Sequence, residues 1–228
     1  ATTFRDPQTK AAVMTSLGTA SVTTLIIAFL GVPLAYLLAR FRFPGKTLIS
    51  IFTLLPLVLP PVSAGILLLV LYGPYGTLGQ LLSPRGLTFV DSASGIVLAQ
   101  IFVAAPFAIV AARSAFEGLE IEYEEAAVSM GATLWQSFWH IALPLARRGI
   151  LAGLILSWMR ALGEFGATVI LAYHPYSLPV LNYVNLSSTG LTEALPLALI
   201  ALVMASAVLL ALFLLERFDW GSRLSQPK

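Results

Sequence analysis

The chain has 228 residues, of which 58% are hydrophobic and only 11% are charged, and it contains no cysteine. Soluble domains carry roughly 25% charged residues, so this composition excludes an ordinary water-soluble fold and predicts a protein that spans a membrane. The lack of cysteine excludes disulfides and cysteine-based metal sites in this chain, and a net charge of +2 with dispersed positive residues argues against a nucleic-acid partner.

Five apolar segments follow one another along the chain, each long enough to cross a bilayer core of ~30 Å as a helix. We expect these spans at about residues 13–38, 48–72, 94–112, 150–173 and 194–215. The predicted fold is therefore all-α, with a single polytopic transmembrane domain over residues 1–228. The first ten residues are polar and the first apolar run has full length, so we predict no cleavable signal peptide.

The distribution of lysine and arginine predicts the orientation, because short cytoplasmic loops are enriched in these residues. One side of the membrane would carry nine of them: Arg40, Arg42, Lys46, Arg113, Arg147, Arg148, Arg217, Arg223 and Lys228. The other side would carry only Arg5, Lys10 and Arg85. We therefore expect the N-terminus outside the cell and the C-terminus in the cytoplasm.

A polar loop of about thirty residues, 116–145, separates the third and fourth spans on the predicted cytoplasmic side. Residues 116–130 favour a helix, and Gly131 can take the left-handed conformation that ends one. Residues 134–141 favour a second short helix, which Pro144 would stop. A helix, a glycine corner and a second helix form a rigid projection suited to contact with a soluble partner.

The polar and aromatic residues of this loop leave two interpretations open. Glu117, Glu120 and Glu124 lie near one face of the first predicted helix, which favours an acidic contact surface. Alternatively, the loop lies along the membrane interface, with Trp135 and Trp139 among the lipid headgroups. We favour the contact surface, because the interfacial interpretation assigns no purpose to the acidic face.

The spacing within the loop resembles the EAA loop of ABC-importer permeases. That pattern is EAA, three residues, a glycine, nine residues and then I-x-L-P, and the chain fits it without a gap from Glu125 to Pro144. The resemblance implies a coupling helix that docks in a groove of a separate cytoplasmic ATPase. It assigns the coupling role to Glu124, Glu125, Ala126, Ala127, Ser129, Met130, Gly131, Leu143 and Pro144.

The same resemblance suggests a role for individual positions. Glu125 would meet a basic residue of the ATPase, Ala126 and Ala127 would permit close approach, and Gly131 would form the corner. The chain has no Gly-rich loop ending in Lys-Ser or Lys-Thr, so we predict a transport subunit without its own ATPase site. ATP and Mg²⁺ would be bound by the partner ATPase, and no cofactor or metal is expected in this chain.

A charged pair, Arg160 and Glu164, lies within the fourth span, where an unpaired charge costs roughly 2.5–3.5 kcal/mol. Four residues separate them, which allows an ion pair across one helical turn. Either Arg160 lines an anion route and Glu164 holds it, or the pair fixes helix packing. Gly163 and Gly166 would let another segment come close, and Thr168 completes the pathway candidates of this span.

The second span is rich in proline, which removes backbone donors and predicts a broken helix. We interpret Pro60 and Pro61, with Ser63, as a gate element beside a pathway, and Pro56 as part of a short membrane-entry segment. In the first span, by contrast, small and hydroxyl residues recur at helical spacing, which favours a packing face over an ion site. These are Ser16, Thr19, Ala20 and Thr23.

The run from Arg160 to Thr168 resembles the molybdate/tungstate branch of these permeases, with the sulfate branch close to it, and the likeness continues in residues 43–46 and 55–62. It implies a homodimer in a bacterial or archaeal cell membrane, two ATPase subunits and an extracytoplasmic oxyanion-binding protein. Transport would proceed by alternating access. The alternatives are a sulfate or thiosulfate permease, a proton-coupled carrier that uses the charged pair, and a non-transporting scaffold for an ATPase.

Overall fold

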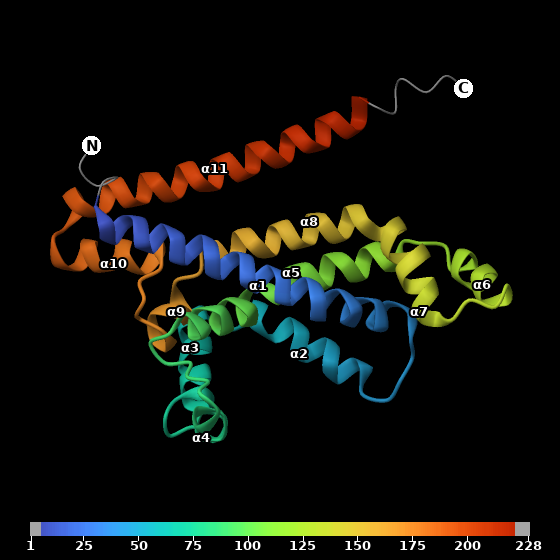
Figure 1. The fold of residues 1–228 in the computed structure, drawn as a ribbon, viewed down its shortest axis with the longest axis horizontal. Helices are drawn as coiled ribbons and strands as arrows, with labels where there is room; N and C mark the ends of the chain where they lie inside the picture. Colours follow the sequence, from blue (N-terminus) through green and yellow to red (C-terminus); the bar gives the residue numbers. More distant parts are fainter. Residues whose placement is uncertain (1–5, 222–228) are drawn as a thin grey trace. The chain divides into compact units, whose positions relative to one another are not determined.

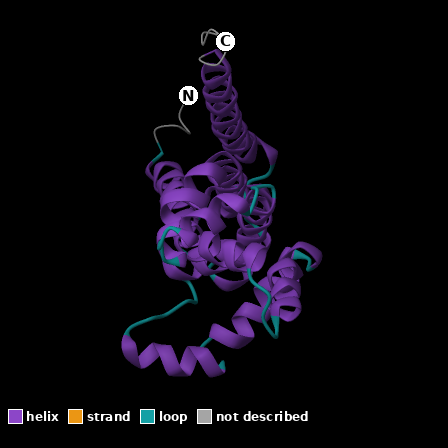
Figure 2. Cartoon of the chain, turned by 90° about the vertical axis from the view of Figure 1, so that its right-hand side faces the viewer, coloured by secondary structure: helices purple, strands orange, loops and turns teal. Residues whose placement is uncertain are grey.

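The computed structural model describes residues 6–221, with side chains to residue 210, and every regular element in that part of the chain is a helix (Figures 1 and 2). Contacts divide the chain into a larger unit, residues 14–175, and a smaller unit formed by residues 1–13 and 176–228. Four positive residues used to predict the orientation lie outside the described side chains: Arg5, Arg217, Arg223 and Lys228.

Four described helical segments are long and apolar enough to cross a membrane, and the bent pair of α3 and α4 would make a fifth. The four are α1 (Pro7–Arg40), α5 (Ala93–Glu117), the segment Leu134–Leu162 that includes α8 (Leu143–Leu162), and the first part of α11 (Leu191–Gly221). The all-α class is therefore confirmed, and four or, with the bent pair, five membrane-length segments agree with the expected number. The second and fourth predicted spans differ most from the structure.

The second predicted span is not one continuous helix. α2 (Lys46–Val58) ends before Leu59, and a separate helix, α3 (Pro61–Tyr72), begins at Pro61 and is followed by α4 (Thr77–Leu82). A proline fits the first turn of a helix because the amide that it lacks would have no intrahelical partner there. The break falls at Pro60 and Pro61 as expected, whereas Pro56 lies inside α2.

The fourth predicted span also differs from the structure at both ends. α8 begins at Leu143 and carries Pro144 in its first turn, so this proline does not stop the helical segment as predicted. A short π-helical segment, Phe138–Ala142, leads into α8 directly from α7 (Leu134–Ser137). At the other end α8 stops at Leu162, and α9 (Gly166–Leu171) follows a three-residue break.

The core of the larger unit forms where α1, α5 and α8 pack together, and small residues allow the closest approach. A Cβ atom added to Gly153 would lie 2.6 Å from Cβ of Ala111, and one added to Gly149 would lie 2.5 Å from Cβ of Ala115. Glycines at such a spacing let two membrane helices approach backbone to backbone. Ala20 of α1 is fully buried in the same core.

The smaller unit has its own apolar core, in which Ala12 packs with residues of α10 (Leu178–Ser188) and α11. The N-terminus of α1 in this unit is capped by Asp6, whose carboxylate accepts hydrogen bonds from the amide and the hydroxyl of Thr9. These bonds lower the pKa of Asp6 from its ordinary value.

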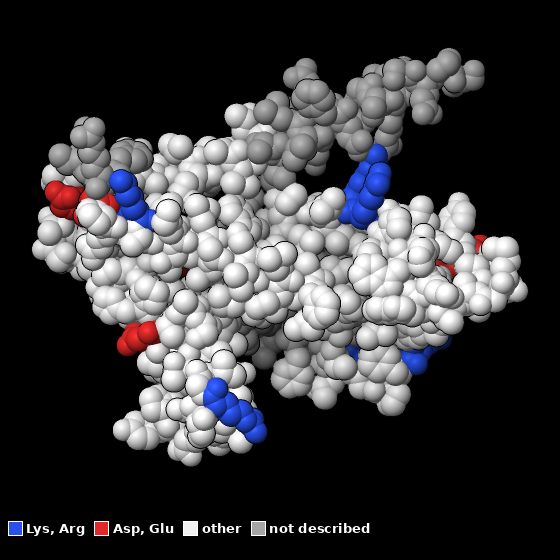
Figure 3. Space-filling model, viewed as in Figure 1, with Lys and Arg blue, Asp and Glu red and all other residues white. Residues whose placement is uncertain are grey.

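Charged side chains are sparse on the face shown in Figure 3, with wide uncharged surface between them. Large apolar side chains such as Phe29 and Val58 are about four-fifths exposed, at 79% and 82%. Apolar exposure on this scale is unfavourable in water. It is the surface expected of a protein that lies in a membrane.

Candidate functional site

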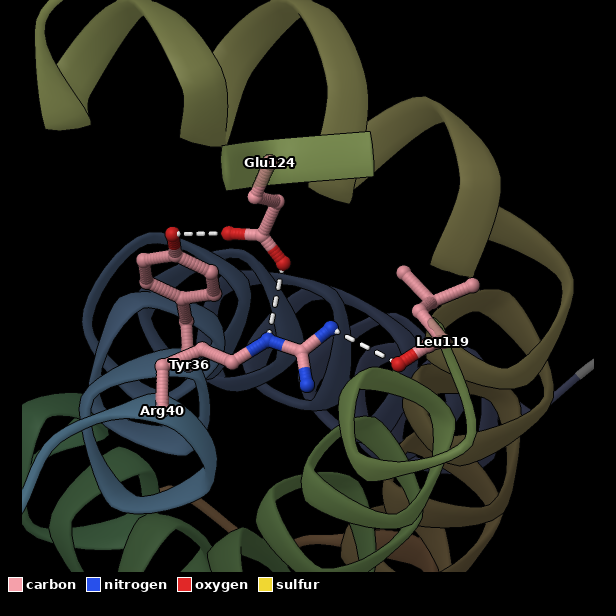
Figure 4. A network of polar contacts seen from close by, with 4 residues as sticks. All are labelled: Tyr36, Arg40, Leu119 and Glu124. Carbon is pink, nitrogen blue, oxygen red and sulfur yellow. Dashed lines mark hydrogen bonds and ion pairs between the residues drawn. The ribbon is translucent and has the colours of Figure 1, made fainter. Parts of the chain in front are cut away.

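The polar loop is attached to the rest of the molecule through a buried carboxylate. Glu124 projects from α6 (Glu122–Ser129) onto the end of α1, where it is only 8% exposed. The hydroxyl of Tyr36 donates to Oε2 of Glu124 at 2.5 Å, and Nε of Arg40 donates to Oε1 at 2.8 Å (Figure 4). Arg40 also donates through Nη2 to the carbonyl of Leu119 at 3.1 Å. A buried carboxylate requires charge-assisted partners of this kind.

The three glutamates expected on one face are in fact separated. Glu117 belongs to the end of α5, where it pairs with Arg113 at 2.8 Å. Glu120 lies in the turn before α6. Glu124 points inward, so the predicted acidic face does not exist. The reason is that α5 extends to Glu117 and a turn then redirects the chain before α6 begins.

A cluster of aromatic rings packs around Tyr36 next to this attachment. The Tyr36 ring lies 5.2 Å from the Phe116 ring and 4.8 Å from the Phe138 ring, measured between centroids. Phe116 is fully buried and Phe138 nearly so. Tyr36 comes from α1 and Phe116 from α5, while Phe138 belongs to the π-helical segment of the loop, so the loop packs against the ends of two long helices.

The opposite face of α6 is open to solvent. Glu125, Ala126, Ser129 and Met130 are exposed, and Met130 retains 84% of its accessible surface. Ala127 is buried and packs within the chain, so of the two alanines only Ala126 faces outward. α6 therefore has an inner face bound to α1 and an outer face available to another molecule.

The corner after α6 forms at Gly131 as the sequence predicts. Its φ is +96°, in the left-handed region that favours glycine. The amide of Gly131 bonds the carbonyl of Val128, and the amide of Ala132 bonds the carbonyl of Ala127, which together form a Schellman motif. Thr133 then caps α7 with a capping box to Gln136, so the chain is defined on both sides of the corner.

The end of the EAA pattern joins this loop directly to the membrane helix. Leu143 is half-buried against the core cluster that contains Phe138, while Pro144 is exposed in the first turn of α8. No helix end separates the π-helical segment from α8, so the loop continues directly into this helix.

The charged pair occupies the break between α8 and α9. Oε2 of Glu164 lies 2.6 Å from Nη1 of Arg160, and Oε1 of Glu164 accepts the amide of Ala167 at 2.8 Å. Glu164 is 1% exposed, whereas the Arg160 side chain is 28% exposed. The expected ion pair is therefore present, but it crosses a helix end. Glu164 caps the next helix at the same time.

The second and fourth predicted spans, both broken in the structure, contact each other near these breaks. A Cβ atom on Gly166 would lie 2.7 Å from Cβ of Pro61, and one on Gly65 would lie 2.8 Å from the carbonyl oxygen of Ala167. α3 and α9 thus pack backbone to backbone, and each glycine is required at its contact. The structure therefore brings together Pro61 and Gly166, two of the pathway candidates.

The remaining pathway candidates differ in their surroundings. Pro60, Ser63 and Gly163 are exposed on the isolated chain. Thr168 is fully buried, and its hydroxyl has no hydrogen-bond partner within the described part of the chain.

Sequence reasoning missed three residues that the structure connects to these sites. Tyr36 and Arg40 hold Glu124, and Gln100 of α5 binds the end of α8 beside the break. The available signals were weak. They were a Tyr–Arg pair four residues apart at the end of a span, and a lone amide within another span.

Together, long apolar helices, a solvent-facing loop helix and two helix breaks define an integral membrane subunit of a transporter. The chain belongs to the family of binding-protein-dependent transport system inner membrane components, whose model matches residues 31–223. The family expected from the EAA loop is thereby confirmed, as is a location in the membrane.

Individual relatives cover most of this chain. A probable molybdenum ABC transporter permease protein of Haloferax volcanii is 46% identical over 205 residues, which are 90% of this chain and 75% of that protein. A molybdate/tungstate transport system permease protein of Thermococcus kodakarensis is 37% identical and covers 92% of this chain and 80% of its own length. A molybdenum transport system permease protein of Escherichia coli is also 37% identical, over 98% of this chain and 97% of that protein.

Solved structures support the fold. A bacterial ABC transporter that imports alginate matches with a TM-score of 0.76 at 21% identity, over 95% of this chain and 82% of that one. An amino acid ABC transporter matches with a TM-score of 0.65 at 19% identity, over 92% of this chain and 94% of that one. The chain therefore has the fold of an ABC-importer membrane subunit.

Proposed function

We propose that the chain is the membrane-spanning permease subunit of an ATP-driven importer for an oxyanion, with molybdate or tungstate as its substrate. The observation that carries this proposal is the two-faced α6 helix. Its outer face is open and its inner face is bound to a transmembrane helix through Glu124. Relatives named for molybdenum or for molybdate and tungstate support the substrate and favour it over sulfate.

The outer face of α6 is the proposed docking surface for a cytoplasmic ATPase, which would bind ATP and Mg²⁺. Glu125 offers an exposed carboxylate and Met130, at the end of the helix, an exposed apolar side chain, and the small Ala126 leaves room for close approach. Ser129 and the Gly131 corner complete the surface. This chain would hydrolyse no ATP itself. Docking to a cytoplasmic ATPase requires the loop to lie on the cytoplasmic side of the membrane.

The inner face of α6 would convert docking into movement of the membrane helices. Glu124 joins α6 to Arg40 and Tyr36 of α1 through charge-assisted hydrogen bonds. Leu143 and Pro144 join the same loop to α8. A displacement of α6 would therefore move two transmembrane helices together, because a buried ion pair and a ring cluster resist separation.

The transport cycle would be alternating access in an assembly of two copies of this chain, two ATPase subunits and an extracytoplasmic receptor. Closure of the ATPase dimer would draw the two loops together and open the pathway outward. The receptor would then release its anion. Arg160 would attract the anion at the break between α8 and α9, while Glu164 keeps that attraction weak enough for release.

Reconstitution tests this function directly. Proteoliposomes that contain the chain, its ATPase and its receptor should take up molybdate and tungstate when ATP is supplied on the ATPase side, with a protonophore present. Uptake of sulfate in preference to molybdate would contradict the proposed substrate. Uptake driven by a proton gradient without any ATPase would contradict the proposed mechanism.

A further inference from the structure

A single amide side chain in the apolar interior connects three transmembrane helices. Gln100 of α5 is 1% exposed. Its Oε1 accepts the hydroxyl of Thr23 at 3.0 Å, and its Nε2 donates to Oγ1 of Thr19 at 3.2 Å and to the carbonyl of Ala161 at 3.0 Å. These partners come from α1 and α8. The hydroxyl residues of the first span, which we expected to form a packing face, therefore also hold this amide.

The bond to Ala161 lies where the fourth span breaks. The last carbonyls of a helix have no intrahelical partner, and hydrocarbon supplies no water to bind them. The carbonyl of Ala161 is one of these, because α8 ends at Leu162. It accepts the amide of Glu164 at 3.1 Å and the side chain of Gln100 at 3.0 Å. Gln100 thus supplies a bond from a neighbouring helix at the start of the break.

We propose that Gln100 is a positioning residue that sets where the fourth span unwinds and thereby holds the Arg160–Glu164 pair in place. Ala161 directly follows Arg160 and lies three residues before Glu164. The effect on anion transport rests on the proposed function, whereas the effect on the break does not.

Gln100→Leu is a suitable test because the other groups keep partners after the change. The hydroxyl of Thr19 also bonds the carbonyl of Thr15 at 2.8 Å, and that of Thr23 reaches the carbonyl of Val97 at 3.5 Å. The carbonyl of Ala161 keeps the amide of Glu164. Leucine also preserves most of the side-chain volume, so the variant should insert and fold.

Ser157→Ala provides the matched control. Ser157 is fully buried in α8 one turn before Ala161, and its hydroxyl donates to the carbonyl of Ala104 in α5 at 3.0 Å. This change also removes one buried hydrogen bond between α5 and α8. It does not touch the end of α8. The comparison therefore distinguishes a general weakening of the packing between α5 and α8 from a change at the break itself.

The absence of cysteine from the chain allows a single reporter at the break. Gly163→Cys is sterically possible, since an added Cβ would meet only the carbonyl oxygen of Met159 at 3.6 Å. A nitroxide attached there reports local mobility in lipid or in water. The full-length chain would be measured in its complex with the ATPase, reconstituted in lipid.

We expect Gln100→Leu to raise the ratio of mobile to immobilised nitroxide roughly fivefold, the scale of one net hydrogen bond, while Ser157→Ala leaves the ratio unchanged. No change in Gln100→Leu, or equal changes in both variants, would overturn the inference. Uptake by the same proteoliposomes keeps the two proposals apart. If the Gln100→Leu ratio rises but even the unsubstituted chain imports no molybdate, the inference stands and the proposed function fails.

Discussion

Nε of Arg40 lies 2.8 Å from Oε1 of Glu124, and this contact joins the end of the first transmembrane helix to the helix that carries the EAA sequence. Both side chains are about nine-tenths buried, with 11% and 10% of their surfaces exposed. The neighbouring Glu125 is exposed. Two adjacent glutamates therefore have different environments, and their substitutions should have different consequences.

Arg40→Met should destabilise the protein by roughly 3 kcal/mol, the scale of leaving one member of a buried pair without its partner. The hydroxyl of Tyr36 would still donate a hydrogen bond to the carboxylate of Glu124, but no positive charge would remain beside it. Thermal unfolding of the purified protein measures the change. The double variant Arg40→Met/Glu124→Gln should recover much of the loss, because no charge remains buried. A double variant less stable than Arg40→Met alone would contradict the pairing.

Glu125→Lys should weaken association with the ATPase while insertion and stability remain normal, since this side chain is exposed. Co-purification of the ATPase with the chain measures the association. Glu122→Lys makes the same charge change at another exposed position of α6 and serves as the control. Unchanged co-purification of Glu125→Lys, or an equal loss in both variants, would remove the docking role of Glu125.

Gly131→Ala should destabilise the loop by about 1 kcal/mol, because φ at this position is +96° and alanine disfavours the left-handed region. Steric crowding does not contribute to this destabilisation, since an added Cβ would have no neighbour within 4 Å. Gly131→Asn should cost less, because asparagine tolerates this conformation. ATP hydrolysis stimulated by the loaded receptor, measured in the complex, should fall in the same order. Equal effects of the two substitutions would contradict a conformational cause.

Gly166→Ala should destabilise the contact of α3 with α9 by about 1–3 kcal/mol, the usual cost of overpacking. The new methyl group would lie 2.7 Å from Cβ of Pro61, within a backbone-to-backbone contact. Gly163→Ala, three residues earlier, has room for its methyl group and should change stability by less than about 0.5 kcal/mol. Melting temperatures of the two variants, compared in one detergent, decide the matter. A similar loss in both would show that the close approach is not the cause.

Glu164→Ala should reduce assembly or flux more than the double variant Arg160→Ala/Glu164→Ala, because the single change leaves Arg160 without its partner. The double variant should not recover fully, since Glu164 also accepts the amide of Ala167. Yield of the assembled complex and ATP-dependent uptake are the measurements. Identical defects in the single and double variants would argue that the two side chains do not interact.

The features that the sequence predicted correctly depend on residues close together in the chain. The length of apolar runs set the number of spans, and the proline pair set a break at Pro60 and Pro61. Gly131 was expected to take a left-handed conformation from its position after a helix, and it does. Such properties are local, because backbone conformation and membrane insertion depend on a few neighbouring residues.

Pro144 marks the limit of this local reasoning. A proline suits the residue after a helix and the first turn of a new one equally well. The sequence favoured a stop, whereas the helix continues because Ala142 and Ala146 on either side are buried in the core and keep the segment helical.

Membrane location, an all-helical fold and the EAA spacing with its corner were thus determined by the sequence alone. Tertiary structure decided which face of α6 is free. Glu124 is bonded to residues 88 and 84 positions away, and Gln100 is bonded to a carbonyl 61 positions away. A pattern within one helix cannot specify these partners, because they depend on the rotation of each helix against its neighbours, which small-residue contacts such as Gly153 against Ala111 select.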